Sequence, residues 1–298
     1  MPSHPLYSAN RMKLGVMAFN CSGGSTVTTA PEAWPMTWAD NVKLAQMCDQ
    51  AGFEALLPVG RWKGYGGTSN FNNRTFETLT WAAGLGAVTE QIAVLSTVHV
   101  PLMHPVAVAK QAATIDHITN GRFVLNIVCG WFRDEFEMFG AEWREHDRRY
   151  EYATEWLTLA RKLWTEEEAF DWDGEFFQGK GLWSQPKPIQ QGGPVIMNAG
   201  SSPVGQQFSA SQCDMNFVML RQKDEESDAA QIAGLKTMAA EHGRSSQCWI
   251  HVYVVCRETE KEAQDALHRY VIDYGDDVAV GNMLATFGME SETLEPSV

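Results

Sequence analysis

Short apolar runs alternate with longer amphipathic segments along almost the whole chain. The runs expected to form strands lie at 13–19, 55–58, 92–98, 123–128, 195–198, 215–219 and 249–256. The segments expected to form helices lie at 37–51, 76–88, 105–119, 147–164, 202–211, 224–242 and 259–274. Strands that alternate with helices are typical of parallel βαβ crossovers, and the pattern therefore predicts a doubly wound sheet or a barrel.

Two features favour the barrel. The first strand–turn–helix lacks the GxGxxG pattern of a dinucleotide-binding sheet. The 298 residues contain no linker, repeat or low-complexity stretch, and α/β barrels of about 250 residues form one domain. We therefore expect a single barrel domain over 1–298, with a small hairpin inserted near 166–190 around Asp173-Gly174. Only seven strand–helix units are evident, because 281–298 carries no clear eighth strand and helix.

Charge and cysteine usage limit the partners. Lysine and arginine total 23 against 37 acidic residues, a net charge of −14, which argues against nucleic acid or anionic membrane as a partner. The six cysteines form no CxxC pair, which indicates reduced thiols in a cytosol. Residues 1–12 contain no signal-peptide core, and no apolar stretch approaches the roughly 18 residues of a membrane span. We expect a soluble, cytoplasmic protein.

In barrels the active site is built at the carboxyl ends of the strands. Polar residues at the predicted ends are Asn20 and Cys21, Gly60 and Arg61, Thr97 and His99, Asn126 and Cys129, and 198–202. Asn126 interrupts an apolar strand, and its amide either bonds to a neighbouring strand or serves the site. Taken alone, Thr97 is more simply a β-forming residue.

The turn at 198–205 (NAGSSPVG) leads from a strand into a helix. Its free backbone N–H groups and hydroxyls suit a phosphate, although many βα turns use glycine and serine. The histidines match no metal-binding spacing, and we expect no metal site.

The segment 126–150 (NIVCGWFRDEFEMFGAEWREHDRRY) resembles the flavin-dependent luciferase-like monooxygenases. Within that family it is most similar to the branch of the pyrimidine and dimethyl sulfone monooxygenases. Further similarity lies at 52–67, 78–97 and 112–123, in FDWDGEFF followed by QPKP, and in the AGSS turn. The resemblance covers 14 to about 274 and implies a (β/α)8 TIM barrel that functions as a homo-oligomer. The eighth unit would then be missing or truncated, or another subunit would cover the gap.

Carried over residue by residue, the family's FMN site falls on Gly60, Arg61, Asn126, Glu135, Arg149, Tyr150 and Ser202, with Ser201 beside it in the phosphate turn. The resemblance also places Thr97 and Asn126 on the oxygen-binding side of the flavin, as the catalytic pair. It thereby replaces the structural interpretation of both residues with a functional one.

The implied reaction is a monooxygenation of a small organic substrate by O2. Reduced FMN would come from a separate NAD(P)H:flavin reductase, and the protein would supply orientation and exclude water. One alternative is an F420-dependent oxidoreductase of the same family, which moves hydride without O2. Another is a non-catalytic flavin-binding partner subunit. The Thr97/Asn126 pair and the motif GWFxxEF favour FMN.

Overall fold

A computed structural model describes residues 4–220 and 224–287, and its main layer is a parallel sheet of seven strands. The strand order is β1-β2-β3-β4-β7-β8-β9, so each strand pairs with the strand of the next strand–helix unit. The strands are β1 (Gly15–Met17), β2 (Ala55–Leu57), β3 (Ala93–His99), β4 (Phe123–Val128), β7 (Val195–Asn198), β8 (Met215–Val218) and β9 (Gln247–Ile250). All seven predicted strands are therefore confirmed, with β4 and β7 at the predicted bounds.

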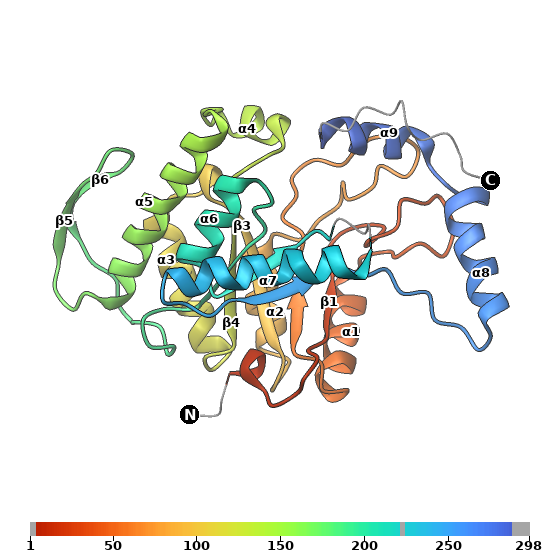
Figure 1. The fold of residues 1–298 in the computed structure, drawn as a ribbon, viewed down its shortest axis with the longest axis horizontal. Helices are drawn as coiled ribbons and strands as arrows, with labels where there is room; N and C mark the ends of the chain where they lie inside the picture. The colour runs from red at the N-terminus through yellow and green to blue at the C-terminus, as the bar shows by residue number, and fades with distance from the viewer. Residues whose placement is uncertain (1–3, 221–223, 288–298) are drawn as a thin grey trace.

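Helices cover the outside of this sheet (Figure 1). They are α1 (Trp38–Gln50), α2 (Thr78–Gly86), α3 (Pro105–Ile118), α4 (Arg133–Phe139), α5 (His146–Thr165), α6 (Pro203–Gln212), α7 (Glu225–Glu241), α8 (Glu260–His268) and α9 (Asp277–Thr286). Short 3-10 helices span Pro5–Tyr7 and Val100–Leu102, and a π-helix spans Arg269–Asp273. Thr259 and Glu262 form the capping box that the sequence indicates.

The two faces of the sheet bury different clusters. On β3, Val94 and Val98 pack outward against the helices, whereas Ala93 and Leu95 point inward. The inward cluster joins residues of β2, β3, β4, β7 and β8, and Leu6 packs into it, fully buried. Met17 of β1 and Trp249 of β9 contact the same cluster. Because both edge strands line one interior, the sheet is curled into part of a barrel.

A buried carboxylate, that of Asp49, fixes the backbone at the start of β3, the strand that carries much of the site. Asp49 at the end of α1 accepts hydrogen bonds from the backbone N–H groups of Glu90, Gln91 and Ile92 at 2.8, 2.9 and 2.7 Å. These three residues lead directly into β3. Part of the acidic composition is therefore structural, since one carboxylate satisfies three backbone donors that a turn would otherwise leave open.

The hairpin strands β5 (Phe170–Asp173) and β6 (Gln178–Leu182) lie within the predicted 166–190. Three features differ from the prediction, the first being that the expected loop before α5 contains α4. The last predicted strand ends at Ile250 instead of residue 256, and the following helix breaks at His268 into a π-helix. The apolar residues Val252 and Val254 are 64% and 74% exposed, because nothing in the described chain packs on them.

The hairpin and the last two helices lie at opposite ends of the molecule. The β5–β6 hairpin projects beyond α5, and α8 and α9 lie at the opposite end (Figure 1). After β9 the described residues hold helices but no eighth strand, and 288–298 lie outside the described residues. No helix in the described ranges is long and apolar enough to cross a membrane.

Candidate functional site

The curled interior changes from apolar to polar at the carboxyl ends of β3 and β4. Thr97 and His99 follow Leu95 on the inward face of β3, and Asn126 follows Val124 on that of β4. Thr97 and Asn126 are register partners, and the Asn126 amide Nδ2 donates to Thr97 Oγ1 at 3.1 Å. The Asn126 Oδ1 atom is buried and has no hydrogen-bond partner among the described residues. The Nδ2 atom of Asn126 thus connects two strands, whereas its Oδ1 atom is left without a partner.

The Thr97 side chain ties three strands together. Its hydroxyl donates to the Pro58 carbonyl oxygen at 2.7 Å while accepting from Asn126. The backbone of Gly60 passes so close that an added Cβ would lie 3.0 Å from Thr97 Cγ2. Glycine at position 60 therefore lets the loop after β2 approach this strand end without displacing Thr97. The structure brings Gly60, Thr97 and Asn126 together as the sequence predicts.

Glu135 of α4 is fully buried and bridges three elements. Its Oε1 atom accepts from the Trp62 backbone N–H at 2.8 Å and from Arg61 Nη1 at 3.3 Å, and its Oε2 atom lies 3.1 Å from His99 Nδ1. Burial by itself would raise the pKa of Glu135. The contact with His99, the Arg61 charge and the Trp62 N–H outweigh it and hold that pKa below its usual value. Glu135 is therefore an ionised acceptor.

Aromatic rings enclose the Arg61 guanidinium. Its central carbon lies 4.6 Å from the ring centre of Trp131 and 5.3 and 5.4 Å from those of Tyr65 and Phe132. Arg61 Nη2 also donates to the Tyr65 hydroxyl at 2.9 Å, whereas its buried Nε has no partner within the described chain. Phe287 stacks on Trp131 with ring centres 4.7 Å apart. This packing fixes the guanidinium in one place.

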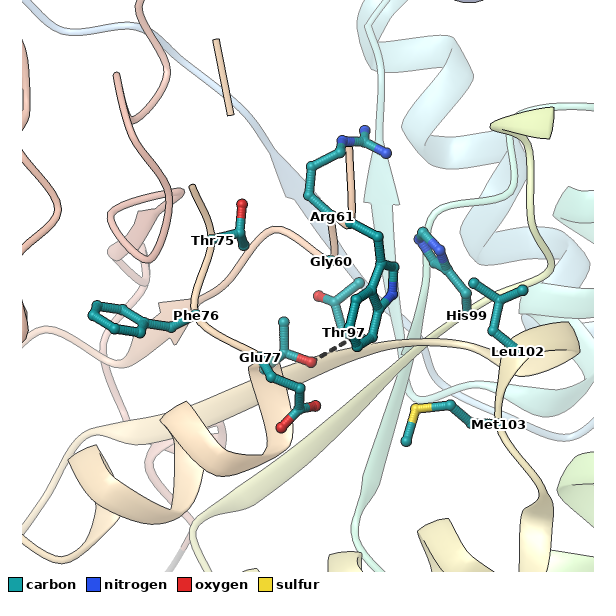
Figure 2. A pocket seen from close by; sticks show the side chains of 11 residues that line it. Gly60, Arg61, Thr75, Phe76, Glu77, Thr97, His99, Leu102 and Met103 are labelled. Carbon is teal, nitrogen blue, oxygen red and sulfur yellow. Dashed lines mark hydrogen bonds between the residues drawn. The ribbon is translucent and has the colours of Figure 1, made fainter. Parts of the chain in front are cut away.

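A cleft with an empty volume of about 440 Å³, part of it open to solvent, lies above these residues. Figure 2 shows Thr97 near its middle, with Gly60 and Arg61 above it and His99, Leu102 and Met103 to one side. The full lining is Gly60, Arg61, Trp62, Thr75, Phe76, Glu77, Thr78, Thr97, His99, Leu102 and Met103. Apolar and polar groups thus share its wall, as in small-molecule sites.

A second group of predicted residues lies where α5 and α6 begin. Ser202 is the N-cap of α6 and accepts from the Gly205 N–H at 3.2 Å, and the Tyr150 hydroxyl is hydrogen-bonded to Ser202. Burial raises the pKa of Tyr150, so this phenol keeps its proton. An added Cβ on Gly205 would lie 2.5 Å from the Tyr150 hydroxyl oxygen, which explains a glycine there. Ser201 is exposed.

Arg149 belongs to the same group. Its Nη1 atom donates to the Gly130 carbonyl oxygen, and its buried Nε has no partner among the described residues. The Asn198 side chain connects this group to β4, because its Nδ2 donates to the Ile127 carbonyl at 2.7 Å while its Oδ1 accepts from Gly200 N at 2.8 Å. Two polar clusters therefore lie along the same rim of the sheet.

The remaining strand-end candidates are structural. Asn20 bonds to both the N–H and the carbonyl of Val59, at 2.9 Å each, and so joins the ends of β1 and β2. Burial raises the pKa of the Cys21 and Cys129 thiols to about 12, which leaves neither as a nucleophile. Within the described ranges no three His, Cys, Asp or Glu side chains gather as a metal site.

Sequence reasoning missed what holds these residues in place. It named His99 only as a strand-end residue and Glu135 only through the family resemblance, and it did not predict that the two side chains meet. The signal available was period-2 alternation, which puts His99 on the same face as Thr97.

Comparison with known proteins identifies relatives along most of the chain. The family model described as luciferase-like monooxygenase matches residues 12–295. An FMNH2-dependent dimethylsulfone monooxygenase of Pseudomonas fluorescens is 34% identical over 274 residues, which cover 92% of this chain and 72% of the relative. The pyrimidine monooxygenase RutA of Acinetobacter baylyi is 34% identical over 282 residues, covering 93% and 74%.

A solved structure agrees on the fold. Riboflavin lyase, determined with modified FMN and riboflavin, aligns with a TM-score of 0.83 at 23% identity, over 97% of this chain and 72% of the lyase chain. The predicted resemblance is thus confirmed, and the chain belongs to the luciferase-like monooxygenase family.

Proposed function

We propose that this protein is a monooxygenase that uses externally supplied reduced FMN and O2 to oxygenate a small organic substrate. Its homologues include FMNH2-dependent monooxygenases, which supports FMN over the F420 alternative. The observation that carries the proposal is the Thr97–Asn126 pair, which presents a buried, unpartnered amide oxygen at the polar end of the curled sheet.

The residues present fit FMN. Buried polar atoms without partners cost free energy, and four of them, Asn126 Oδ1, Glu135 Oε2, Arg61 Nε and Arg149 Nε, lie on predicted site residues. Asn126 with Gly60 and Arg61 would hold the polar edge of the flavin ring. The phosphate would lie at Arg149, Tyr150, Ser202 and Ser201, where a guanidinium, hydroxyls and the first N–H groups of α6 meet.

The chemistry that bound reduced FMN supplies is the activation of O2 and the transfer of one oxygen atom to the substrate. Thr97 acts there as a hydrogen-bond acceptor, because its own hydrogen is given to the Pro58 carbonyl. Asn126 offers its amide oxygen to a donor. Glu135, a predicted flavin contact, also positions the loop after β2, because its Oε1 atom accepts from Arg61 and from the Trp62 N–H. The aromatic enclosure keeps water from the Arg61 guanidinium, whose side chain is 5% exposed.

Several finer features belong to the same proposal. We infer that the curled sheet is most of a (β/α)8 TIM barrel, in which an eighth strand would lie between β9 and β1. A separate NAD(P)H:flavin reductase supplies reduced FMN, and the protein is a homo-oligomer. Free thiols at all six cysteines support a cytoplasmic location.

An anaerobic titration with reduced FMN, followed by mixing with O2, tests the proposal. We expect saturable binding and oxidation kinetics that differ from those of free reduced FMN. Replacing Asn126 by Ala is expected to lower oxygenated product about 10²-fold, the usual loss for one preorganised polar group, while flavin affinity changes little. Absence of reduced-FMN binding would refute the proposal, and full turnover by Asn126→Ala would remove that residue from it.

A further inference from the structure

His99 is the last residue of β3 and lies two positions after Thr97 on the same inward face. Its side chain is only 6% exposed and lines the cleft beside Leu102 and Met103 (Figure 2). The imidazole therefore lines the same cleft as Thr97, although the sequence marks it only as a polar residue at a strand end.

Glu135 determines how the ring is used. The His99 Nδ1 atom lies 3.1 Å from Glu135 Oε2, within ion-pair distance, and Oε2 has no other partner among the described residues. Because an ionised carboxylate has no hydrogen to give, Nδ1 is the ring nitrogen placed to donate toward it. Arg61 Nη1 lies 3.3 Å from the other carboxylate oxygen. The second ring nitrogen, Nε2, then holds a free lone pair. It has no hydrogen-bond partner among the described residues.

The other titratable groups around the cleft are already committed. Arg61 is shared between Glu135 and the Tyr65 hydroxyl. The Glu77 carboxylate caps α2 by accepting from the N–H groups of Leu79 and Thr80 at 2.9 and 2.7 Å. His99 therefore brings to the cleft a ring nitrogen without a hydrogen-bond partner, whereas both Glu77 oxygens already accept from backbone N–H groups.

We propose that His99 is a further catalytic residue, whose Nε2 accepts a proton from an N–H or O–H group of the substrate, and that Glu135 is its positioning residue. This inference rests on the proposed function and deepens it. Reduced FMN supplies two electrons, one oxygen atom enters the product, and the other leaves as water. The proton taken by Nε2 is returned to the departing oxygen, so the ring ends the cycle neutral.

The first test observes the ring directly in the full chain labelled with ¹⁵N-histidine. We expect the His99 signals, identified by their loss in His99→Asn, to show hydrogen on Nδ1 and none on Nε2 at neutral pH. Glu135→Gln should release this preference, because an amide can donate to Nδ1 as well as accept from it. Hydrogen fixed on Nε2 in the wild-type protein would overturn the proposal, whatever the flavin chemistry proves to be.

The second test measures function with reduced FMN, O2 and two probes, uracil, which carries N–H groups, and dimethyl sulfone, which carries none. Asn retains a donor toward Glu135 but places no titratable atom in the cleft. We expect His99→Asn to lower product from uracil about 10²-fold. Product from dimethyl sulfone should change far less, because that probe carries no N–H or O–H proton for the ring to accept.

Flavin affinity, measured by quenching of FMN fluorescence, should stay the same in His99→Asn and in the control His117→Asn, an exposed histidine on α3. Wild-type product from uracil in His99→Asn, or an equal loss with both probes, would overturn the proposal. If the wild-type chain binds no reduced FMN or oxygenates neither probe, the proposed function fails, while the ring spectrum still decides the role of Glu135.

Discussion

The part of the chain from β1 to β8 and the part from β9 to α9 are built differently. All seven residues of β3 are buried, and α5 buries a full stripe of side chains. In contrast, β9 and α8 contain no buried residue. Every predicted site residue lies in the first part. The polar site is thus supported by close-packed strands and helices, which is what holding side chains in fixed positions requires.

The last part is attached mainly through polar contacts. Thr28 and Thr29 donate to the Tyr274 carbonyl, and Arg269 pairs with Glu32 on the surface. Exposed ion pairs contribute little to stability. The Ser69 N–H donates to Asp276 at 2.6 Å, beside the loop that carries Arg61. The two parts should therefore respond very differently to the loss of apolar side chains.

The largest expected difference is in stability. Phe123 of β4 is fully buried in the cluster between the sheet and the helices that cover it. Phe123→Ala should therefore lower the free energy of unfolding by about 3–5 kcal/mol. Val254, which is 74% exposed, is the matched position in the last part, and Val254→Ala should change it by less than about 0.5 kcal/mol. Urea unfolding measures both. Similar losses would mean that 251–256 is packed in solution and that the contrast is wrong.

Within the first part, the two clusters of the site can be separated by ligand binding. Arg149→Ala should weaken FMN binding by about 1.5–3 kcal/mol, the range for hydrogen bonds to a charged group. Its neighbour Arg148 is the matched control, since its guanidinium is exposed and pairs with Glu151 and Glu175. Arg148→Ala should leave the affinity unchanged. Equal effects on fluorescence titration would indicate a general charge effect instead of a phosphate contact.

Much of the fold was predictable because the packed part follows simple periodicities. Residues 123–128 and 195–198 are short runs buried on both faces, and such runs have sharp ends. The run 249–256 has a similar apolar pattern in the sequence, yet only its first residues pair with β8. The sequence marks a segment as apolar, but it does not tell whether a neighbour is present to bury it.

The site was predictable to the extent that strand ends mark it. Thr97 and Asn126 were identified before their register was known, and their side chains do meet. The contacts of Glu135 were not predictable from local pattern, because its partners come from the loop after β2 and the end of β3. Helix α4 had a readable signal, with Asp134 and Glu135 in its first turn and Gly140 in the left-handed conformation after it.

The smallest effect concerns a contact between the two parts near the site. Asn282 of α9 donates to the Tyr65 carbonyl at 2.7 Å, and Tyr65 in turn holds Arg61. Asn282→Ala should cost about 0.5–1.5 kcal/mol of stability and leave FMN affinity almost unchanged. Gly281→Ala, next to it with open space around the added carbon, should instead stabilise by about 0.4–1 kcal/mol. Thermal unfolding of both variants measures the change in stability, and FMN titration measures the change in affinity. If Asn282→Ala weakens FMN binding more than it lowers stability, α9 belongs to the site and the boundary drawn between the two parts lies too early in the chain.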